Sequence, residues 1–442
     1  MIGEPSRSGD GALVRAMGVR SLAAATFNIM IGGGIFLLPA VAAAGLGAAA
    51  PLAYVVCAVA MGLIVLCFAE AGSRVSLSGG PYAYVEVAFG PFVGFLAGIL
   101  LWLLGSFATA AVASGLAGSV AAFWSPLGAP AARAVLLLAV FAVLAMINVR
   151  GVRQGVRFVE GVTVAKLLPL LLFVLVGAFF VHPGNLAWGA VPAAHDVGRT
   201  AIVLIFAFAG MESALVPSGE IRDPARTVPC ALFIAMGGVV LLYVAIQLVA
   251  QGVLAGEVAR HTDAPLAAAA LDFAGRTGAV VMLAGAAVSM FGFVSGMTLA
   301  VPRALFALGR DGVLPGRLAA VHPRFHTPHV AIIVQAAIAC ALAITGSFAA
   351  LAVLANVSVL VLYLLCCVAV LELRRRDVRT GGIPFQVPGG WLVPVLAVAV
   401  ILWLLWSATL RELGIVSGVL AAAALLFILK TAARRVPASP EP

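Results

Sequence analysis

One apolar segment of this sequence reads Asn28-Ile29-Met30-Ile31-Gly32-Gly33-Gly34-Ile35-Phe36-Leu37-Leu38-Pro39. A second apolar segment has a glycine and a proline at the same spacing and reads Phe206-Ala207-Phe208-Ala209-Gly210-Met211-Glu212-Ser213-Ala214-Leu215-Val216-Pro217. In each, a proline follows the first glycine by seven residues. Glycine weakens a helix and proline removes a backbone donor, so both segments are predicted to be broken helices. Lipid cannot satisfy the bare N–H and C=O groups, so such backbone must line a cavity enclosed by protein.

The composition is that of a membrane protein. Of the 442 residues, 63% are hydrophobic and 10% are charged, and the mean hydropathy is +1.17. In soluble domains, about a quarter of the residues are charged. The apolar runs are continuous rather than alternating, which favours spanning helices over a β-barrel. No metal site is predicted, because the six cysteines lack ligand spacing and prolines interrupt the His322, His326 and His329 set. The sequence has no phosphate-binding glycine loop followed by Lys-Ser/Thr, so ATP-driven transport is not predicted either.

Twelve spanning helices are predicted, since each needs about 20 apolar residues. They cover 21–44, 50–73, 91–123, 131–148, 157–181, 198–219, 228–251, 277–307, 328–346, 348–373, 391–409 and 412–432. A short interfacial helix is expected over 79–90, and an amphipathic surface helix over 257–275. The chain then divides into a tail (1–20), a transport core of ten helices (21–373), helices eleven and twelve (391–432) and a second tail (433–442).

The two broken segments fall in the first and sixth predicted spans. This places two repeats of five spans, at about 21–181 and 198–373. Because five is odd, the second repeat enters the membrane from the opposite side. The predicted fold class is therefore an all-α polytopic membrane protein with a 5+5 inverted repeat and discontinuous helices one and six.

The basic residues predict the orientation. With a cytoplasmic N-terminus, 20 of the 26 lysines and arginines fall in inside segments, five fall outside, and Lys166 lies within the fifth span. This bias matches the positive-inside rule. We therefore expect a multi-pass protein of the inner (cytoplasmic) membrane with both termini in the cytoplasm. The net charge of +9 then faces anionic lipid, and no nucleic-acid partner is predicted.

The two breaks are candidate substrate-binding sites. The helix that restarts after Ile31–Gly34 presents free N–H groups and a positive dipole end, which suit a carboxylate. The unwound stretch Phe206–Gly210 offers carbonyl groups, which suit an ammonium. A zwitterionic α-amino acid carries both charges on one carbon and would match the pair. The alternative is close helix packing through small residues, a common use of glycine in membranes.

Two charged residues are candidates for coupling. Lys166, one of only two lysines, lies deep in the fifth span, where a charge is costly and is usually functional. It could carry a proton through the transport cycle, or its fixed ammonium could replace a bound Na⁺; the alternative is snorkelling to the interface. Glu212 follows the second break and could cap the restarted helix, exchange protons or sense the substrate ammonium.

Four further side chains are candidates for the wall of the pocket. Phe206 and Phe208 lie within the second break and could line or gate the site, although aromatic residues on helices more often serve packing. Thr109 in the third span and Ser358 in the tenth are weaker polar candidates.

These motifs resemble the amino acid–polyamine–organocation (APC) superfamily of secondary transporters, with its LeuT-type fold, over almost the whole chain. Similar motifs are the first-span glycine segment, Gly79-Gly80-Pro81-Tyr82-Ala83-Tyr84, the second break with Gly219-Glu220-Ile221-Arg222-Asp223-Pro224, and Pro302-Arg303 through Asp311-Gly312. The resemblance implies a substrate held by Ile31, Gly32, Gly33, Gly34, Phe206, Ala207, Phe208 and Gly210. It also implies that Lys166 fills the place of a sodium ion, so that transport is sodium-independent and either H⁺-coupled or an exchange.

The prediction is an amino acid permease that works by alternating access. The apolar surroundings of Phe206, Phe208 and Met211 favour neutral amino acids. A cationic amino acid or polyamine antiporter is the alternative within this class, and a membrane receptor or sensor is the alternative outside it. No enzyme activity and no cofactor are predicted, because the sequence shows no convergent acid–base or metal-binding groups. The expected partners are the amino acid substrate and the lipid bilayer; the sequence predicts no oligomeric state.

Overall fold

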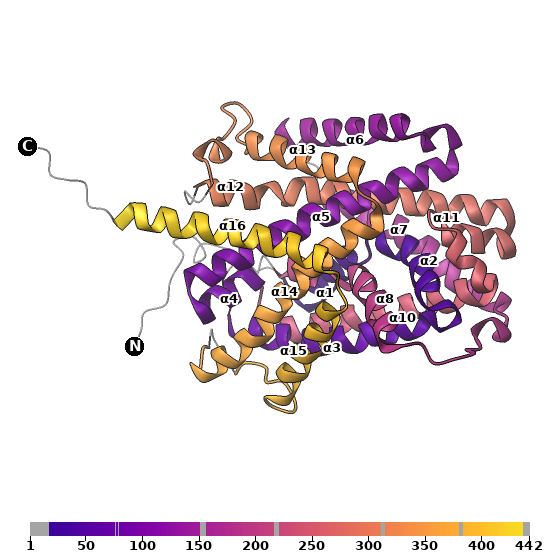
Figure 1. Ribbon diagram of the computed structural model, residues 1–442, viewed down its shortest axis with the longest axis horizontal. Helices are drawn as coiled ribbons and strands as arrows, with labels where there is room; N and C mark the ends of the chain where they lie inside the picture. The colour runs from indigo at the N-terminus through magenta and orange to yellow at the C-terminus, as the bar shows by residue number, and fades with distance from the viewer. Residues whose placement is uncertain are drawn as a thin grey trace, which may run out of the picture.

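The computed structural model describes residues 17–75, 77, 79–150, 156–215, 221–310, 314–379 and 383–435. Over these residues the secondary structure is helical, apart from an isolated bridge between Met17 and Ile221. Figure 1 shows the helices packed into one bundle. Their bounds are α1 Val19–Met30, α2 Gly34–Leu46, α3 Ala50–Arg74, α4 Pro81–Phe89, α5 Pro91–Phe123, α6 Pro130–Arg150, α7 Val156–Gly177, α8 Ala194–Phe208, α9 Met211–Ala214, α10 Pro224–Leu254, α11 Pro265–Ala300, α12 Pro302–Arg310, α13 His329–Thr345, α14 Phe348–Arg375, α15 Leu392–Trp406 and α16 Leu410–Arg435.

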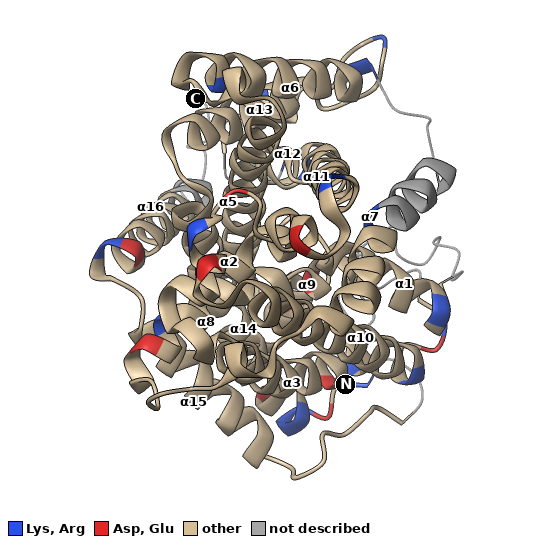
Figure 2. Cartoon of the chain, turned by 90° about the vertical axis from the view of Figure 1, so that its right-hand side faces the viewer, with Lys and Arg blue, Asp and Glu red and all other residues tan. Residues whose placement is uncertain are grey.

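The bundle is that of a polytopic membrane protein. Within the described ranges, eight helical stretches are long and apolar enough to span a bilayer: Gly34–Arg74, Pro91–Phe123, Pro130–Arg150, Ala194–Ala214, Pro224–Arg260, Pro265–Arg310, Phe348–Arg375 and Leu410–Leu429. Lys166–Phe180, His329–Thr345 and Leu392–Trp406 are shorter apolar helices. The exterior is apolar as well, since Val135, Leu175 and Leu241 are more than 60% exposed. Charged residues are sparse along the chain (Figure 2). Twelve spans and the inverted repeat stay predictions.

Both predicted breaks are present. α1 ends at Met30, the backbone is non-helical over residues 31–33, and α2 begins at Gly34. α8 ends at Phe208, and Gly210 then adopts φ +130°, a conformation that favours glycine. A Cβ atom at Gly210 would lie 3.3 Å from the backbone of both Ile29 and Met30. The two breaks therefore touch, and glycine permits that approach.

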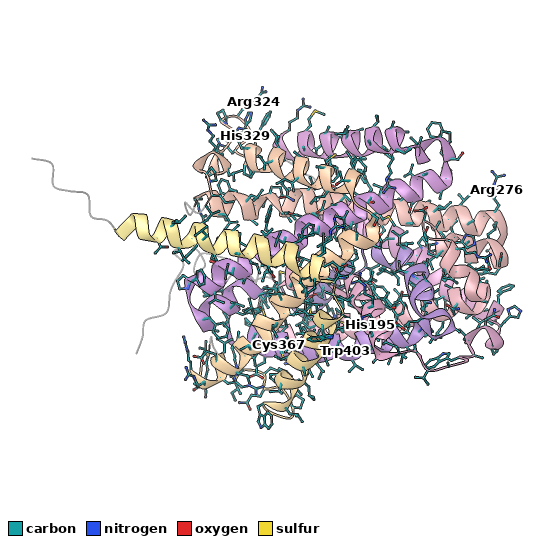
Figure 3. All side chains as sticks on the ribbon, viewed as in Figure 1. His195, Arg276, Arg324, His329, Cys367 and Trp403 are labelled. Carbon is teal, nitrogen blue, oxygen red and sulfur yellow. The ribbon has the colours of Figure 1, made fainter. Side chains whose placement is uncertain are left out.

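The long helices α5 and α10 organise the packing around the breaks. α5 runs through the centre of the bundle and packs mainly against α14 and α11, while α10 packs mainly against α3 and α1. Proline within the first two residues of α3, α4, α5, α10 and α11 fixes where those helices begin. The side chains of Arg276 and Arg324 lie towards different ends of the bundle (Figure 3).

A buried carboxylate holds α3 against α14. Glu70 is fully buried and accepts hydrogen bonds from Arg74 Nε (3.0 Å), Arg374 Nε (2.7 Å) and the backbone N–H of Val387 (2.9 Å). A second nitrogen of Arg374 also donates to this carboxylate. One carboxylate thus joins two helices and the segment that precedes α15.

One predicted element has different bounds. The amphipathic helix expected over 257–275 is instead a 3₁₀ helix, Ala255–Arg260, followed by the first turns of α11. Pro265 starts that helix, and Gly275, with φ +62°, interrupts it. The short helix expected over 79–90 is α4. The motif residues Pro217, Gly219, Glu220, Asp311 and Gly312 and most of the two predicted tails lie outside the described residues.

Candidate functional site

Three side chains from three helices satisfy the carbonyl groups of the first break. Lys166 Nζ, on α7, donates to the carbonyl of Asn28 and, at 2.8 Å, to that of Ile31. Tyr243 Oη, on α10, donates to the carbonyl of Met30 at 2.9 Å. Ser289 Oγ, on α11, donates to the carbonyl of Gly32 at 3.2 Å. These donors replace the intrahelical partners that the carbonyls lose where α1 ends.

The amide groups on the other side of this break are less fully paired. Gly32 N–H donates to the carbonyl of Met30 at 2.9 Å. The N–H groups of Gly33 and Ile35 make no hydrogen bond to any residue in the described part of the chain. The residue before α2 is Gly33, which has no side chain to cap the start of that helix. The break therefore presents donors at the positive end of a helix dipole.

The three glycines of the first break lie close against neighbouring side chains. A Cβ atom at Gly33 would lie 2.6 Å from Met290 Cγ and 3.0 Å from Val112 Cγ1. At Gly34 it would lie 3.0 Å from the ring of Phe206. A side chain at either position would displace its neighbour. The side chains that contact these glycines are apolar, and they come from α5, α8 and α11.

Capping of the restarted helix is one of the predicted roles of Glu212, and its contacts in the structure fit that role. Its carboxylate is buried and accepts hydrogen bonds from Gly210 N–H (3.0 Å) and Tyr363 Oη (2.7 Å). The tyrosine lies on α14, so the carboxylate joins the break to a neighbouring helix. A role of Glu212 in coupling stays a prediction.

The structure separates the two phenylalanines of the second break. Phe206 lies next to Gly34, and its ring packs edge-on against Phe348 at 5.5 Å between centroids. Phe208 is fully buried between Tyr54 of α3 and Tyr243 of α10, with centroids 6.4 and 5.3 Å away. Phe206 therefore borders the first break, whereas Phe208 serves packing behind it. Ala207 is buried in the last turn of α8.

The two weaker polar candidates bond within their own helices. Thr109 Oγ1 donates to the carbonyl of Gly105 at 2.6 Å, and Ser358 Oγ donates to that of Leu354 at 2.9 Å. Both are buried, and neither has a hydrogen bond that joins it to a break. They stay weaker candidates than the backbone groups.

Sequence reasoning missed several residues that contact the breaks. They include Tyr243, Ser289, Met290, Phe293, Tyr363 and Val112. It also missed Asn356, whose Nδ2 donates to the carbonyls of Ile202 (2.6 Å) and Val203 (3.1 Å) on α8. The available signal was polarity, since an asparagine or a serine deep in an apolar helix needs a hydrogen-bond partner. Among the described residues, no group of three or more His, Cys, Asp or Glu could hold a metal ion.

An apolar helical bundle in which two broken helices meet is the architecture of a membrane carrier. The chain belongs to the amino acid permease family, whose model matches residues 17–429. It is 29% identical over 422 residues to the methylthioribose transporter of Bacillus subtilis, covering 91% of this chain and 90% of that protein. It is 28% identical to a branched-chain amino acid permease of the same organism, covering 92% and 91%. An uncharacterised transporter of Mycobacterium tuberculosis is 32% identical and covers 82% and 81%. The protein is thus a permease of the APC type and not an enzyme.

Proposed function

We propose that this permease carries neutral, apolar amino acids across the inner membrane by alternating access, without sodium. The observation that carries the proposal is the contact between the two breaks, where Gly210 approaches the backbone of Ile29 and Met30. Two interrupted helices that meet inside a bundle are the usual setting of a transporter's substrate site. The proposed substrate-binding groups are the backbone of Ile31–Gly34 and that of Phe206–Gly210, with Thr109 and Ser358 as weaker contributors.

The helices fit a carrier of twelve spans. In the proposed assignment, α1 with α2, α3, α5, α6 and α7 form the first repeat of five spans. The second repeat holds α8 with α9, α10, α11, α13 and α14, and α15 and α16 are two additional spans. Each repeat then begins with a broken helix, which supports the inverted repeat. Both termini are proposed to lie in the cytoplasm, on the positive-inside rule.

The polarity of the first break supports a substrate carboxylate. The N–H groups of Gly33 and Ile35 are donors at the start of α2, and an anion at a helix N-terminus is stabilised by the dipole. The carbonyl groups at the end of α8 would receive the substrate ammonium. A neutral amino acid supplies both charges and needs no further ionic partner.

The side chains around the glycines support an apolar substrate. Val112, Phe206, Met290 and Phe293 are the nearest neighbours of the glycines in the first break. The carboxylate of Glu212 already accepts two hydrogen bonds, so it is a poor partner for a cationic substrate side chain. The names of two relatives point the same way, because branched-chain amino acids and methylthioribose carry no net charge.

The contacts of Lys166 support sodium independence. Its ammonium is bonded to two carbonyl oxygens of the first break, and carbonyl oxygens are ligands that a sodium ion would need. A fixed positive charge on those oxygens opposes a second cation. Transport is therefore proposed to be H⁺-coupled or an exchange, with Lys166 and Glu212 as the coupling residues.

The test is an uptake panel in proteoliposomes with sodium-free buffer, with and without a pH gradient. We expect labelled leucine, isoleucine, valine or methionine to accumulate inside, and liposomes without protein to show none. Strict sodium dependence would contradict the role of Lys166. Uptake of arginine or polyamines alone would favour the antiporter. Binding of an amino acid without flux would favour a receptor.

A further inference from the structure

A row of buried polar side chains runs along α10 and has no place in the proposed substrate site. Tyr243, Gln247 and Gln251 are four residues apart, so they share one face of the helix. All three are fully buried. The row begins at the first break, where Tyr243 Oη donates to the carbonyl of Met30. It ends at the C-terminus of α10, where Gln251 Nε2 donates to the carbonyl of Ala255 at 2.9 Å, beside the exposed Gly256.

The hydrogen bonds along this row are incomplete. Gln247 Nε2 reaches Gln251 Oε1 only at 3.5 Å, and Gln247 Oε1 has no partner in the described part of the protein. The same holds for the hydroxyl of Tyr54 on α3, the helix that packs along α10. The rings of Tyr54 and Tyr243 both pack edge-on against Phe208, so the two tyrosines are neighbours of the same aromatic ring.

Two unpaired polar atoms in a fully buried interface are costly. A buried hydroxyl or amide oxygen without a hydrogen bond costs about 1–3 kcal/mol, and the great majority of such groups are paired to protein or ordered water. Folded proteins hold on the order of one buried water per 27 residues, usually with about three polar partners. The region offers suitable partners: the hydroxyl of Tyr54, the amide oxygen of Gln247 and the lone pairs of the Tyr243 hydroxyl, which donates its own hydrogen to Met30.

We propose that an internal water site lies between α3 and α10, bounded by Tyr54, Gln247 and Tyr243. Gln247 and Gln251 connect this site to the exposed end of α10 near Gly256. Tyr243 connects it to the carbonyl of Met30 in the first break. The carbonyls on either side of Met30, those of Asn28 and Ile31, are the ones that Lys166 holds. The proposed water therefore lies behind the first break, between α3 and α10, and not among the side chains that contact its glycines.

Conservative substitutions distinguish a hydrated site from a dry one. If water is bound, Tyr54→Phe and Gln247→Met each remove one of its partners, and the apparent Tm in lipid nanodiscs falls by roughly 1–3 °C. The double variant loses less than the sum, because both side chains hold the same water. Tyr243→Phe is the control, since it breaks the bond to Met30 and lowers the Tm in either case. If the site is dry, Tyr54→Phe deletes an unpaired hydroxyl; an unchanged or raised Tm would overturn the proposal.

Hydroxyl-radical footprinting provides a second test, which measures the labelling of a buried side chain and needs neither substrate nor transport. Radicals formed from bound water should label Tyr54 on the millisecond timescale, although its side chain is fully buried. The matched control is Tyr84, which is equally buried and packs against Phe68 at 6.5 Å. We expect Gln247→Met to reduce the labelling of Tyr54 at least twofold. Labelling of Tyr54 no greater than that of Tyr84 would refute the water site and leave the transport proposal standing.

Discussion

Replacement of Lys166 by methionine tests the link between the first break and transport. The change removes the donor to the carbonyls of Asn28 and Ile31 while keeping most of the side-chain volume. Two hydrogen bonds to a charged group contribute about 3–6 kcal/mol together. Burying the ammonium opposes this by about 3 kcal/mol on insertion scales. The net loss of global stability is then roughly 0–3 kcal/mol, so we expect the variant to insert and fold.

The transport rate should decrease more than the stability, because the lost hydrogen bonds all belong to the first break. If the break loses about 3 kcal/mol of preference for its present geometry, the competent fraction falls by roughly a hundredfold. The assay is sodium-free counterflow in proteoliposomes, with the Tm measured on the same preparation. Lys166→Gln keeps N–H donors without the charge and should retain intermediate flux. Lys430→Met, at the only other lysine, is the matched control. Flux within twofold of the unmodified protein in Lys166→Met would refute this reasoning.

Three further substitutions test other contacts. Glu70→Gln leaves the buried guanidinium of Arg74 and the partly exposed one of Arg374 around a neutral amide, and we expect the free energy of unfolding to fall by about 3 kcal/mol; equal denaturation curves would mean that the pairs contribute little. Glu212→Ala removes the acceptor of the Gly210 N–H and should lower stability by about 2 kcal/mol, and an unchanged Tm would count against the cap. Gly33→Leu should abolish substrate binding in a scintillation proximity assay, whereas Gly62→Leu, with open space around its Cβ, should not; normal affinity in the first variant would exclude the proposed cradle.

The breaks could be predicted from the sequence because glycine acts locally, whereas Pro39 lies within α2, after the first break. Gly210 has φ +130° and touches the backbone of α1, so its identity reports a conformation that few other residues adopt. Lys166 could be predicted for a similar reason, since a charge inside an apolar helix requires partners. The sequence did not identify those partners, which are the carbonyls of Asn28 and Ile31. Backbone carbonyls are the same at every residue, so only the position of the Lys166 side chain in the fold selects them.

Other residues of the candidate site could not be predicted, because their roles depend on contacts between distant helices. Ser289 and Tyr243 lie more than 200 residues from the carbonyls that they bond. A lone hydroxyl in an apolar helix is equally able to bond its own helix, as Thr109 and Ser358 do. Sequence alone does not distinguish the two outcomes. The sequence leads to one prediction for both Phe206 and Phe208, that they line or gate the site. In the structure their rings contact different neighbours at the end of α8, so only Phe206 borders the first break.

The hydrogen bonds at the two breaks explain why the pair would suit a dipolar substrate. In the first break, side chains already hold the carbonyl groups, and the N–H groups of Gly33 and Ile35 are left as donors. In the second, Glu212 already holds the N–H of Gly210, and the end of α8 contributes carbonyl groups. The protein thus pairs the carbonyl groups at the first break and an N–H group at the second. Donors remain at the first break, and acceptors remain at the second. Because Gly210 contacts the backbone of Ile29 and Met30, the two breaks lie next to each other. Under the proposed function, a substrate with an acidic and a basic group on adjacent atoms would pair with both breaks at once.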